Sequence, residues 1–394
     1  MTNRQPASAD EPKKNLKISI ITHEIYPVLS GGAIYVDKIA HELGQLGFEV
    51  DVLSQQIGKD SSYQEYKVYY QITRFWTGRK SVGNATFFDH LFFLLFGMPQ
   101  ILWYIKKENV DLNLCLFAIP AGLFGFVSKI LTGIPYISIV DGADIPNIKS
   151  DMSRFVLILK PLFQAINRYS DAVVLLDGLD DIAIPLLNNK NIHSLSCGMN
   201  IIEESAHPCK NNDGVLHMLS IGRLTSRKGF GHIVAACAIA KRTNDKFHLK
   251  IIGYGNEAIN ITKAINENGL QDNITMVGRV EYDQLSEYYL ESDCYIFFGD
   301  REGQSLALMD AVAYGLPVIC SNHPGMTAFV KDGINGITVD HPDVGQLAQA
   351  ILKMMNDYNK LPEIGLNSKY IAETQSWRNV AIKYKSIINK VLDC

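Results

Sequence analysis

Two carboxylates, those of Glu302 and Asp310, frame a short polar loop within residues 297–318 (FFGDREGQSLALMDAVAYGLPV). An apolar run of strand type precedes the loop, and residues 305–314 have the composition of a helix. A glycine loop that opens a helix leaves backbone N–H groups at the positive end of the helix dipole, where a phosphate can bind. Along a helix axis the two acids would lie roughly 12 Å apart, about the reach of a sugar and a ribose on either side of a diphosphate. The pattern suggests a nucleotide-sugar site, although two such carboxylates alone usually form a solvated face.

A second loop carries two cations, Arg223 and Lys228, between Gly222 and Gly229. It directly follows residues 216–221, an apolar run of strand type. Cations beside glycine-rich backbone suit a diphosphate, because guanidinium, ammonium and amide groups all donate hydrogen bonds to phosphate oxygens. Taken alone, a solvated basic turn explains these residues equally well.

The first half of the chain offers two weaker candidate sites. Gly31 and Gly32 lie between a strand-type run and a helical stretch, and they fit a plain turn as well as a phosphate loop. The GxGxxG fingerprint is missing and no acid ends the second strand, which disfavours NAD. Asp141 and Asp144 follow another strand-type run and form either a catalytic pair or a hydrogen-bonded turn.

Composition and motifs disfavour several other classes of protein. The net charge of -4 provides no basic field for nucleic acid. The 7 cysteines are scattered without a CxxC pair, which argues against a zinc site or a disulfide framework and favours a reducing compartment. Nucleophile elbow, Walker lysine loop and HExxH motifs are also missing.

Strand-type and helix-type runs alternate through both halves of the chain, which predicts an α/β fold of two doubly wound, Rossmann-like domains. The predicted organisation is a polar, disordered leader at 1–16, a first domain at 17–203, a linker at 204–214, a second domain at 215–375 and a closing helix at 376–394.

Residues 87–105 (FFDHLFFLLFGMPQILWYI) are apolar enough to raise the question of a membrane span. Asp89, His90 and Gln100 interrupt the run, which favours a buried helix. A helix that rests on a membrane surface, with Lys106 and Lys107 at its edge, is the alternative.

Several motifs together resemble the family-4 retaining glycosyltransferases of the two-Rossmann (GT-B) fold, within the glycosyl transferases group 1. They are GRLTSRKG, IIGYG, NITMVGRV, EGQSLALMDAVAYGLPVICSNHPGMTAFVKDGINGITV and the N-terminal SGGAIYVDKIAHELGQLGFEV. The resemblance implies two domains that face a central cleft, with the donor nucleotide sugar on the second and the acceptor on the first.

The resemblance also implies site residues. The donor-binding set is Arg223, Lys228, Gly303, Gln304, Ser305, Asp310, Val280, Gly31 and Gly32. The catalytic set is Glu302, which matches the first glutamate of the family's E-x7-E motif, with Asp141 and Asp144 near the transfer site.

The chain departs from the family pattern at two positions. Asp310 stands where the second glutamate, a ribose ligand, is usual, and it is shorter by roughly 1.5 Å. Asp141 stands where many members have a histidine, which leaves Asp144 as the matching carboxylate.

We expect a retaining, metal-independent glycosyltransferase of hexosyl type. It would move a sugar from a nucleoside-diphosphate sugar to an acceptor hydroxyl in cell-surface polysaccharide or glycolipid assembly. Asp300 and Glu302 resemble a metal-binding loop, but the basic pair makes a cation redundant, and the nucleotide sugar is a substrate rather than a cofactor. The expected partners are this donor, a glycan or lipid-linked acceptor and the membrane surface, with no nucleic acid. The expected location is the cytoplasm, at the inner face of the membrane. The alternatives are a sugar-nucleotide epimerase and a non-catalytic nucleotide-sugar binder.

Overall fold

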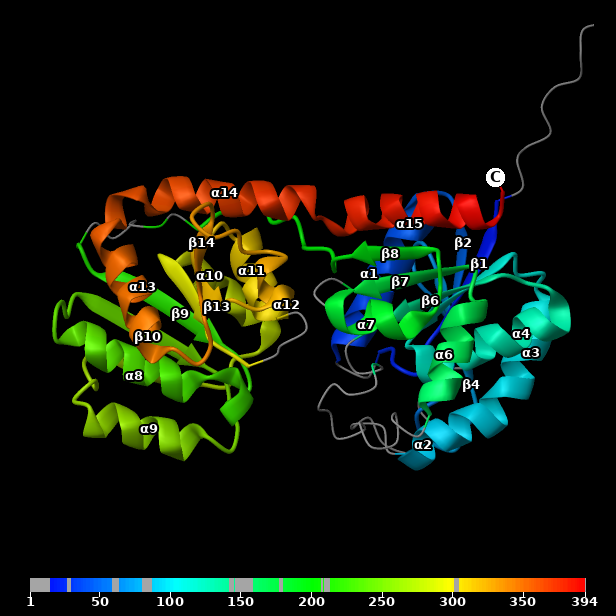
Figure 1. Cartoon of the computed structure of the whole chain (residues 1–394), viewed down its shortest axis with the longest axis horizontal. Helices are drawn as coiled ribbons and strands as arrows, with labels where there is room; N and C mark the ends of the chain where they lie inside the picture. The colour runs from blue at the N-terminus through cyan, green and yellow to red at the C-terminus, as the bar shows by residue number, and fades with distance from the viewer. Residues whose placement is uncertain are drawn as a thin grey trace, which may run out of the picture. The chain divides into compact units, whose positions relative to one another are not determined.

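The computed structural model describes residues 15–26, 30–58, 64–79, 87–141, 145, 159–176, 180–206, 208, 213–300 and 305–393. Contacts between residues divide the chain into two compact units (Figure 1). The first comprises Met1–Val174, Leu187–His193 and Ala381–Cys394, and the second comprises Leu175–Leu186 and Ser194–Val380. The last helix therefore begins in the second unit and ends in the first.

The first sheet has eight strands in the order β3-β4-β2-β1-β5-β6-β7-β8. Its strands are β1 (Lys17–Ile21), β2 (Glu49–Gln55), β3 (Gln64–Tyr66), β4 (Gln71–Phe75), β5 (Leu112–Leu116), β6 (Tyr136–Val140), β7 (Ala172–Leu176) and β8 (Ile192–Leu195). The short edge strand β3 is antiparallel to β4, whereas β1 pairs in parallel with both β2 and β5. The central strands are buried along their whole length, as expected for a parallel sheet covered by helices on both faces.

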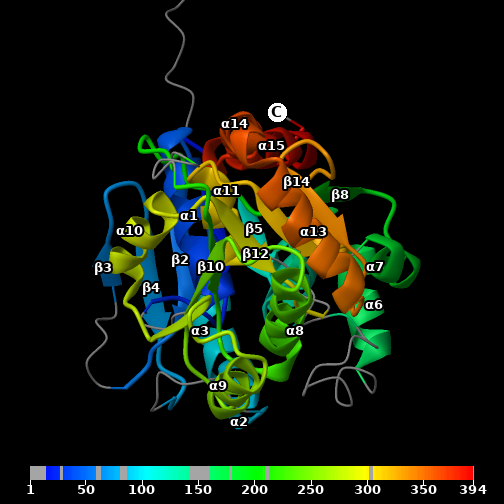
Figure 2. The ribbon, with the colours of Figure 1, turned by 90° about the vertical axis from the view of Figure 1, so that its left-hand side faces the viewer.

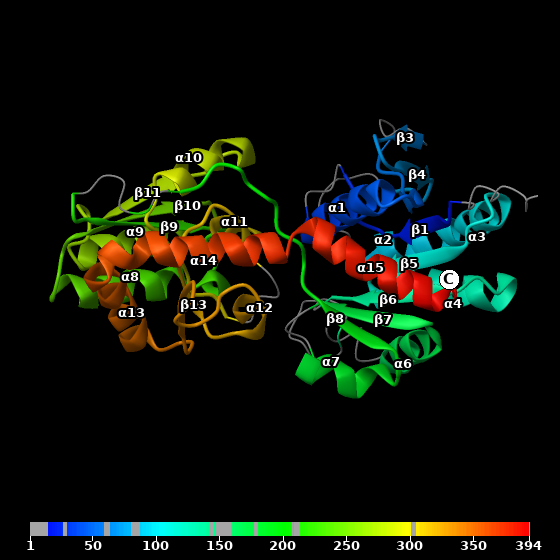
Figure 3. The ribbon, with the colours of Figure 1, turned by 90° about the horizontal axis from the view of Figure 1, so that it is seen from above.

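The helices in this part of the chain are α1 (Gly31–Gln45), α2 (Phe87–Phe92), α3 (Met98–Lys107), α4 (Leu123–Thr132), α6 (Lys160–Tyr169) and α7 (Asp180–Leu187). Aromatic and aliphatic side chains of α3, α4 and α6 form one core with the sheet. α15 (Trp377–Val391) runs beside α1, where the hydroxyl groups of Tyr35 and Tyr384 are hydrogen-bonded (Figure 3).

The second sheet has six strands in the order β11-β10-β9-β12-β13-β14. Its strands are β9 (Leu216–Ile221), β10 (Phe247–Ile252), β11 (Ile274–Gly278), β12 (Cys294–Phe297), β13 (Val318–Ser321) and β14 (Gly336–Val339). The pairs β9–β10, β9–β12, β10–β11, β12–β13 and β13–β14 are all parallel. The chain order reverses direction in space at β9, and ligands of open α/β sheets bind beside such a switch point.

Helices cover both faces of the second sheet. They are α8 (Phe230–Lys241), α9 (Ala258–Glu267), α10 (Leu285–Leu290), α11 (Leu306–Ala313), α12 (Pro324–Thr327), α13 (Val344–Asn356) and α14 (Leu361–Thr374). One core joins the sheet to α8, α9 and α13, and another joins its opposite face to α10, α11 and α14 (Figure 2). The structure thus confirms the predicted α/β fold with two Rossmann-like sheets.

Three local predictions from the sequence were incomplete or wrong. β3 and β4 were not predicted, because their few residues show little periodicity. α14 was not predicted, because its apolar residues lack a regular helical spacing. Gly31 and Gly32 were placed in a loop, but they form the first turn of α1, where Ser30 Oγ accepts a hydrogen bond from the Ala33 N–H at 3.1 Å.

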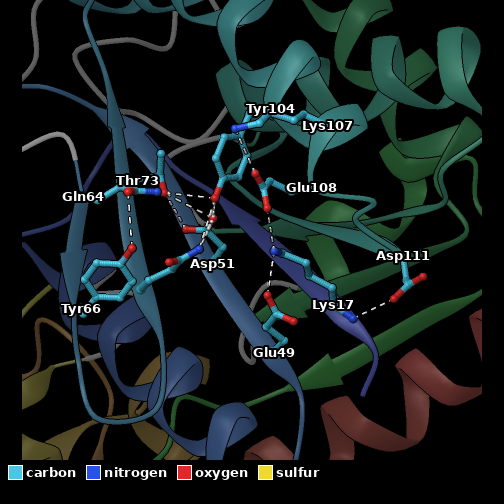
Figure 4. A network of polar contacts seen from close by, with 11 residues as sticks. Lys17, Glu49, Asp51, Gln64, Tyr66, Thr73, Tyr104, Lys107, Glu108 and Asp111 are labelled. Carbon is cyan, nitrogen blue, oxygen red and sulfur yellow. Dashed lines mark hydrogen bonds and ion pairs between the residues drawn. The ribbon is translucent and has the colours of Figure 1, made fainter. Parts of the chain in front are cut away.

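A buried carboxylate joins two strands of the first sheet to α3 (Figure 4). Asp51 on β2 is fully buried and accepts hydrogen bonds from the side chains of Gln71 and Thr73 on β4 and of Tyr104 on α3. Burial raises the pKa of Asp51 to about 6, against the opposing effect of these hydrogen bonds. Nearby, the Lys17 ammonium lies 2.7 Å from Glu49 and 3.3 Å from Glu108.

Asp51→Asn is expected to change how stability depends on pH. The folded state favours the neutral Asp51 carboxyl, so its stabilising contribution is complete at acid pH and disappears as pH rises through about 6. A shift of about two pKa units corresponds to at most about 3 kcal/mol in the free energy of unfolding. Asparagine has no carboxyl group to ionise, so the stability of the variant should not show this decrease as pH rises.

Urea unfolding of both proteins at about pH 4.5 and about pH 8 measures the effect. The control is Asp272→Asn at an exposed carboxylate, which should follow the wild-type profile. Parallel profiles for wild type and Asp51→Asn would contradict the assignment.

Candidate active site

A cavity of about 250 Å³ lies at the carboxyl ends of β9, β10 and β11 in the second unit. It is lined by Ile221, Gly222, Arg223, Ile252, Gly253, Tyr254, Arg279, Val280, Glu281 and Leu285. Each lining segment begins where one of these parallel strands ends or shortly beyond it. This is the edge of an open α/β sheet at which ligands bind.

Backbone contacts between the loops shape this edge. The Gly222 N–H donates to the Ile252 carbonyl at 3.0 Å, and the Gly253 N–H donates to the Gly278 carbonyl at 2.8 Å. A β-carbon at Gly253 would lie 1.9 Å from the Gly222 carbonyl oxygen, so the two loops can approach this closely only because Gly253 lacks a side chain. The same loops line the cavity, so the shape of the cavity depends on glycine at position 253.

Gly229 makes an equally close approach at the start of α8. Its φ of 71° is left-handed, and an added β-carbon would lie 1.8 Å from the carbonyl oxygen of Phe298, beyond β12. The Asp300 N–H donates to the Arg227 carbonyl at 2.9 Å, which holds the loop after β12 against the basic loop after β9. The two loops that the sequence singled out are therefore neighbours.

The two predicted cations occupy different parts of the basic loop. Arg223 is exposed and lines the cavity. Lys228 ends the short 3-10 turn Ser226–Lys228, and its Nζ lies 5.3 Å from the centroid of the Phe297 ring. Its Cδ lies 3.9 Å from the position of a β-carbon at Gly222, so its side chain passes beside the cavity wall.

The structure adds three side chains to the predicted set. The Arg279 guanidinium lies 5.4 Å from the centroid of the Tyr254 ring, and Arg279 Nε donates to Glu281 at 3.1 Å. All three residues line the cavity beside Val280, which the sequence did predict. Tyr254 and Arg279 directly follow the glycines that end β10 and β11, and this position was the available sequence signal.

Asp310 on α11 is linked to the segment that follows β11. The Tyr282 hydroxyl donates a hydrogen bond to Asp310 Oδ2 at 3.3 Å. Tyr282 is the next residue after the cavity-lining Glu281, so the shorter acid lies near that wall. Ser305 is buried at the N-cap of α11. Glu302, Gly303 and Gln304 lie outside the described residues, as does Asp144.

In the first unit, Asp141 directly follows β6 and is half-buried. Burial raises the pKa of Glu24, and the charge of Asp141 raises it further. The Ser30 hydroxyl donates a hydrogen bond to Glu24 Oε2 at 2.6 Å. That same oxygen lies 2.8 Å from the position of a β-carbon at Gly32. The structure thus brings Gly32 and Asp141 near the Glu24 carboxylate, which sequence reasoning missed. Its position after a strand was the available sequence signal.

His23 and His90 pack edge to face beside this carboxylate, with ring centroids 4.6 Å apart. Burial lowers the pKa of both imidazoles, and the nearby Arg79 guanidinium lowers it further. Each Nδ1 atom is buried without a hydrogen-bond partner among the described residues. Both rings are consequently neutral near pH 7, and His23 is a core residue whose Nδ1 has no partner there.

Comparisons with known proteins agree with this arrangement. Residues 202–370 match the family model of the glycosyl transferases group 1. The amylovoran biosynthesis glycosyltransferase AmsK of Erwinia amylovora is 30% identical over 174 residues, which is 43% of this chain and 43% of the relative. The alignment therefore spans less than half the length of that relative.

Solved structures match over almost the whole chain. Sucrose-phosphate synthase from Thermosynechococcus elongatus matches with a TM-score of 0.79 at 19% identity, over 96% of this chain and 100% of that one. HepE of Anabaena in complex with UDP matches with a TM-score of 0.72 at 14% identity, over 95% and 100%. The fold is GT-B. The part of the chain from 202 to 370 belongs to the glycosyl transferases group 1.

Gly229→Ala is expected to destabilise the second unit. The left-handed backbone alone costs a residue with a β-carbon about 1–2 kcal/mol, and the contact with the Phe298 carbonyl adds to it. The control is Gly231→Ala in the first turn of α8, where a β-carbon would meet nothing within 4 Å. Denaturant unfolding should show a lower midpoint for Gly229→Ala only. Equal midpoints for the two variants would refute the close approach.

Proposed function

We propose that the chain is a retaining glycosyltransferase that moves a hexose from a nucleoside-diphosphate sugar to an acceptor hydroxyl. The observation that carries the proposal is the cavity at the carboxyl ends of β9, β10 and β11, with Arg223 in its wall. It lies entirely within the segment that matches the glycosyl transferases group 1. Its position beside a strand-order switch point is where a nucleotide binds in related α/β architectures.

Charge at the basic loop supports a role with the diphosphate. Breaking the bond between sugar and diphosphate leaves negative charge on the leaving group, and fixed cations stabilise that charge as it develops. In the proposal Arg223 and Lys228 provide the cations. The Tyr254 ring, with Arg279 beside it, offers a flat apolar surface suited to the base or ribose.

The other predicted residues take the following roles in the proposal. Glu302 orients the donor sugar, and backbone amides near Gly303 donate to the phosphates. Asp310, with the Tyr282 hydroxyl beside it, contacts the ribose directly or through water. Asp141 and Asp144 contribute from the first unit, on the acceptor side.

Relatives support a role in surface polysaccharide or glycolipid assembly. AmsK is named for amylovoran biosynthesis, and two other relatives are named for colanic acid biosynthesis. A mycobacterial relative, 26% identical over 174 residues, is named a GDP-mannose-dependent phosphatidylinositol monomannoside mannosyltransferase. We propose a glycan or lipid-linked acceptor for this chain on the same basis.

A panel of labelled nucleotide sugars, with and without lipid-linked and glycan acceptors, tests the proposal. Release of free nucleotide that depends on acceptor, with label in an α-linked product from an α-linked donor, supports retaining transfer. Interconversion of the sugar without acceptor would instead indicate an epimerase. Tight binding without turnover across the panel would indicate a nucleotide-sugar binder.

Arg223→Ala and Lys228→Ala are each expected to lower turnover about tenfold or more, because each removes a charge that stabilises the departing diphosphate. Lys263→Ala is the matched control, since this lysine lies on the exposed surface of α9, 3.7 Å from Glu267. Steady-state kinetics at saturating donor distinguishes lost turnover from lost binding. Near-wild-type turnover in both site variants would refute their role.

Transfer is expected to continue after incubation with EDTA and gel filtration, because the two cations take the part that a divalent ion plays in metal-dependent transferases. The measurement is the initial rate before and after chelation. Added Mg²⁺ or Mn²⁺ should raise this rate by less than about twofold. Loss of activity that Mg²⁺ restores would show that the reaction depends on a metal.

A further inference from the structure

An apolar strip runs along the outer face of α2, the π-helical turn Phe93–Gly97 and α3. Its exposed members are Phe88, Phe92, Leu95, Phe96 and Trp103, with Trp76 beyond the end of β4 beside Phe96. Phe88, Trp103 and Trp76 are 63%, 60% and 61% exposed. The spacing of these residues places them on one side of a helical segment of 20 residues. The solvent face of a surface helix is ordinarily polar, so this strip indicates a binding surface.

The opposite face of the same segment is fixed in the core of the first unit. Phe93, Ile101 and Ile105 are fully buried, and the Tyr104 hydroxyl donates to the buried Asp51. A helix that crossed a bilayer would have to withdraw these side chains from the core and leave Asp51 without that donor. The segment can therefore contact a surface with its exposed face while its other face stays in the core. The sequence had instead favoured a fully buried helix.

Polar residues within the segment interact with neighbouring groups. The ring of His90 packs against His23, and the charge of Asp89 acts on the Arg79 guanidinium. The Gln100 side chain donates to the carbonyl oxygens of Trp76 and Phe96 at 3.0 and 2.6 Å. The exposed members of the strip, from Phe88 to Trp103, are themselves uncharged.

A hollow of about 310 Å³ opens beside the strip, lined by Phe75, Pro99, Gln100 and Trp103. Its wall is apolar apart from the Gln100 amide, whose nitrogen is already engaged by two carbonyl groups. A cavity of this kind suits hydrocarbon better than the polar side chains of a protein partner.

Two exposed lysines lie at one end of the strip. Lys106 and Lys107 are exposed at the C-terminal end of α3, and the Lys107 ammonium lies 5.1 Å from the centroid of the Trp103 ring. Tryptophan rings beside lysine ammonium groups are typical of the boundary between lipid headgroups and acyl chains. An aromatic strip that ends in exposed lysines complements an anionic lipid surface.

We propose that the apolar strip binds the surface of a membrane that contains anionic phospholipid. The strip inserts its aromatic side chains among the acyl chains, and Lys106 and Lys107 contact the phosphate groups. The hollow lined by Phe75 and Trp103 accepts the end of a hydrocarbon chain. This binding does not depend on the proposed transfer reaction, so each can fail without the other.

Co-sedimentation of the full chain with vesicles tests the proposal. Vesicles of phosphatidylcholine with phosphatidylglycerol should bind the protein more tightly than phosphatidylcholine alone. The double variant Phe92→Ser/Phe96→Ser should lower the partition coefficient about tenfold or more for both kinds of vesicle, because two inserted aromatic rings are lost. Lys106→Glu/Lys107→Glu should lower it mainly for the anionic vesicles. Leu366→Ser/Tyr370→Ser is the matched control, because it removes two exposed apolar side chains of α14.

Quenching of wild-type tryptophan fluorescence by brominated lipids provides a measurement that needs no variant. The chain has 3 tryptophans. Trp103 in the strip and Trp76 beside it should be quenched, whereas the buried Trp377 should not. Absence of quenching, or equal sedimentation of Phe92→Ser/Phe96→Ser and wild type, would overturn the proposal. So would self-association of the wild type that these substitutions abolish without any binding to vesicles, because the strip would then join copies of the chain.

Discussion

Close approach of backbone to backbone is the constraint on which the carboxyl edge of the second sheet depends. The carbonyl oxygens of Gly222 and Phe298 occupy positions that a β-carbon at Gly253 or Gly229 would need. The loops after β9, β10 and β12 can therefore lie directly against one another, joined by N–H to carbonyl hydrogen bonds. Any side chain at either glycine would push these loops apart and change the cavity that they line.

Side chains at the cavity follow from that backbone. Arg223 is placed at its wall by the turn after Gly222, and Lys228 immediately precedes the left-handed Gly229. Arg279, held between Tyr254 and Glu281, closes the side next to β11. Both arginines of the wall are exposed, and Arg279 is paired with the Glu281 carboxylate, which favours Arg223 as the contact for a strongly charged diphosphate.

Much of the fold could be predicted from the sequence, because buried parallel strands are short apolar runs between glycine and proline. β9 has the predicted bounds, 216–221, since a glycine follows it directly. β3 could not be predicted, because an edge strand of three residues depends on its partner β4 rather than on its own pattern.

The candidate site was predictable to a smaller extent. Arg223, which follows Gly222, and Val280, to which the family resemblance pointed, both line the cavity. The contact between Asp310 and Tyr282 joins residues 28 positions apart, and the proximity of Glu24 to Asp141 joins loops after two different strands. Such contacts depend on how the strands are ordered in the sheet, and the local sequence patterns do not reveal that order.

Hydrogen–deuterium exchange with and without nucleoside diphosphate tests the central claim, that the donor is held by the loops of the second sheet. UDP, GDP, ADP and dTDP are the probes, at concentrations that saturate binding by calorimetry. Binding of any one should slow backbone exchange in residues 222–229, 253–255 and 278–281, because the ligand and its phosphates order these loops. Bound nucleotide that protects other segments and leaves these three unchanged would contradict the account.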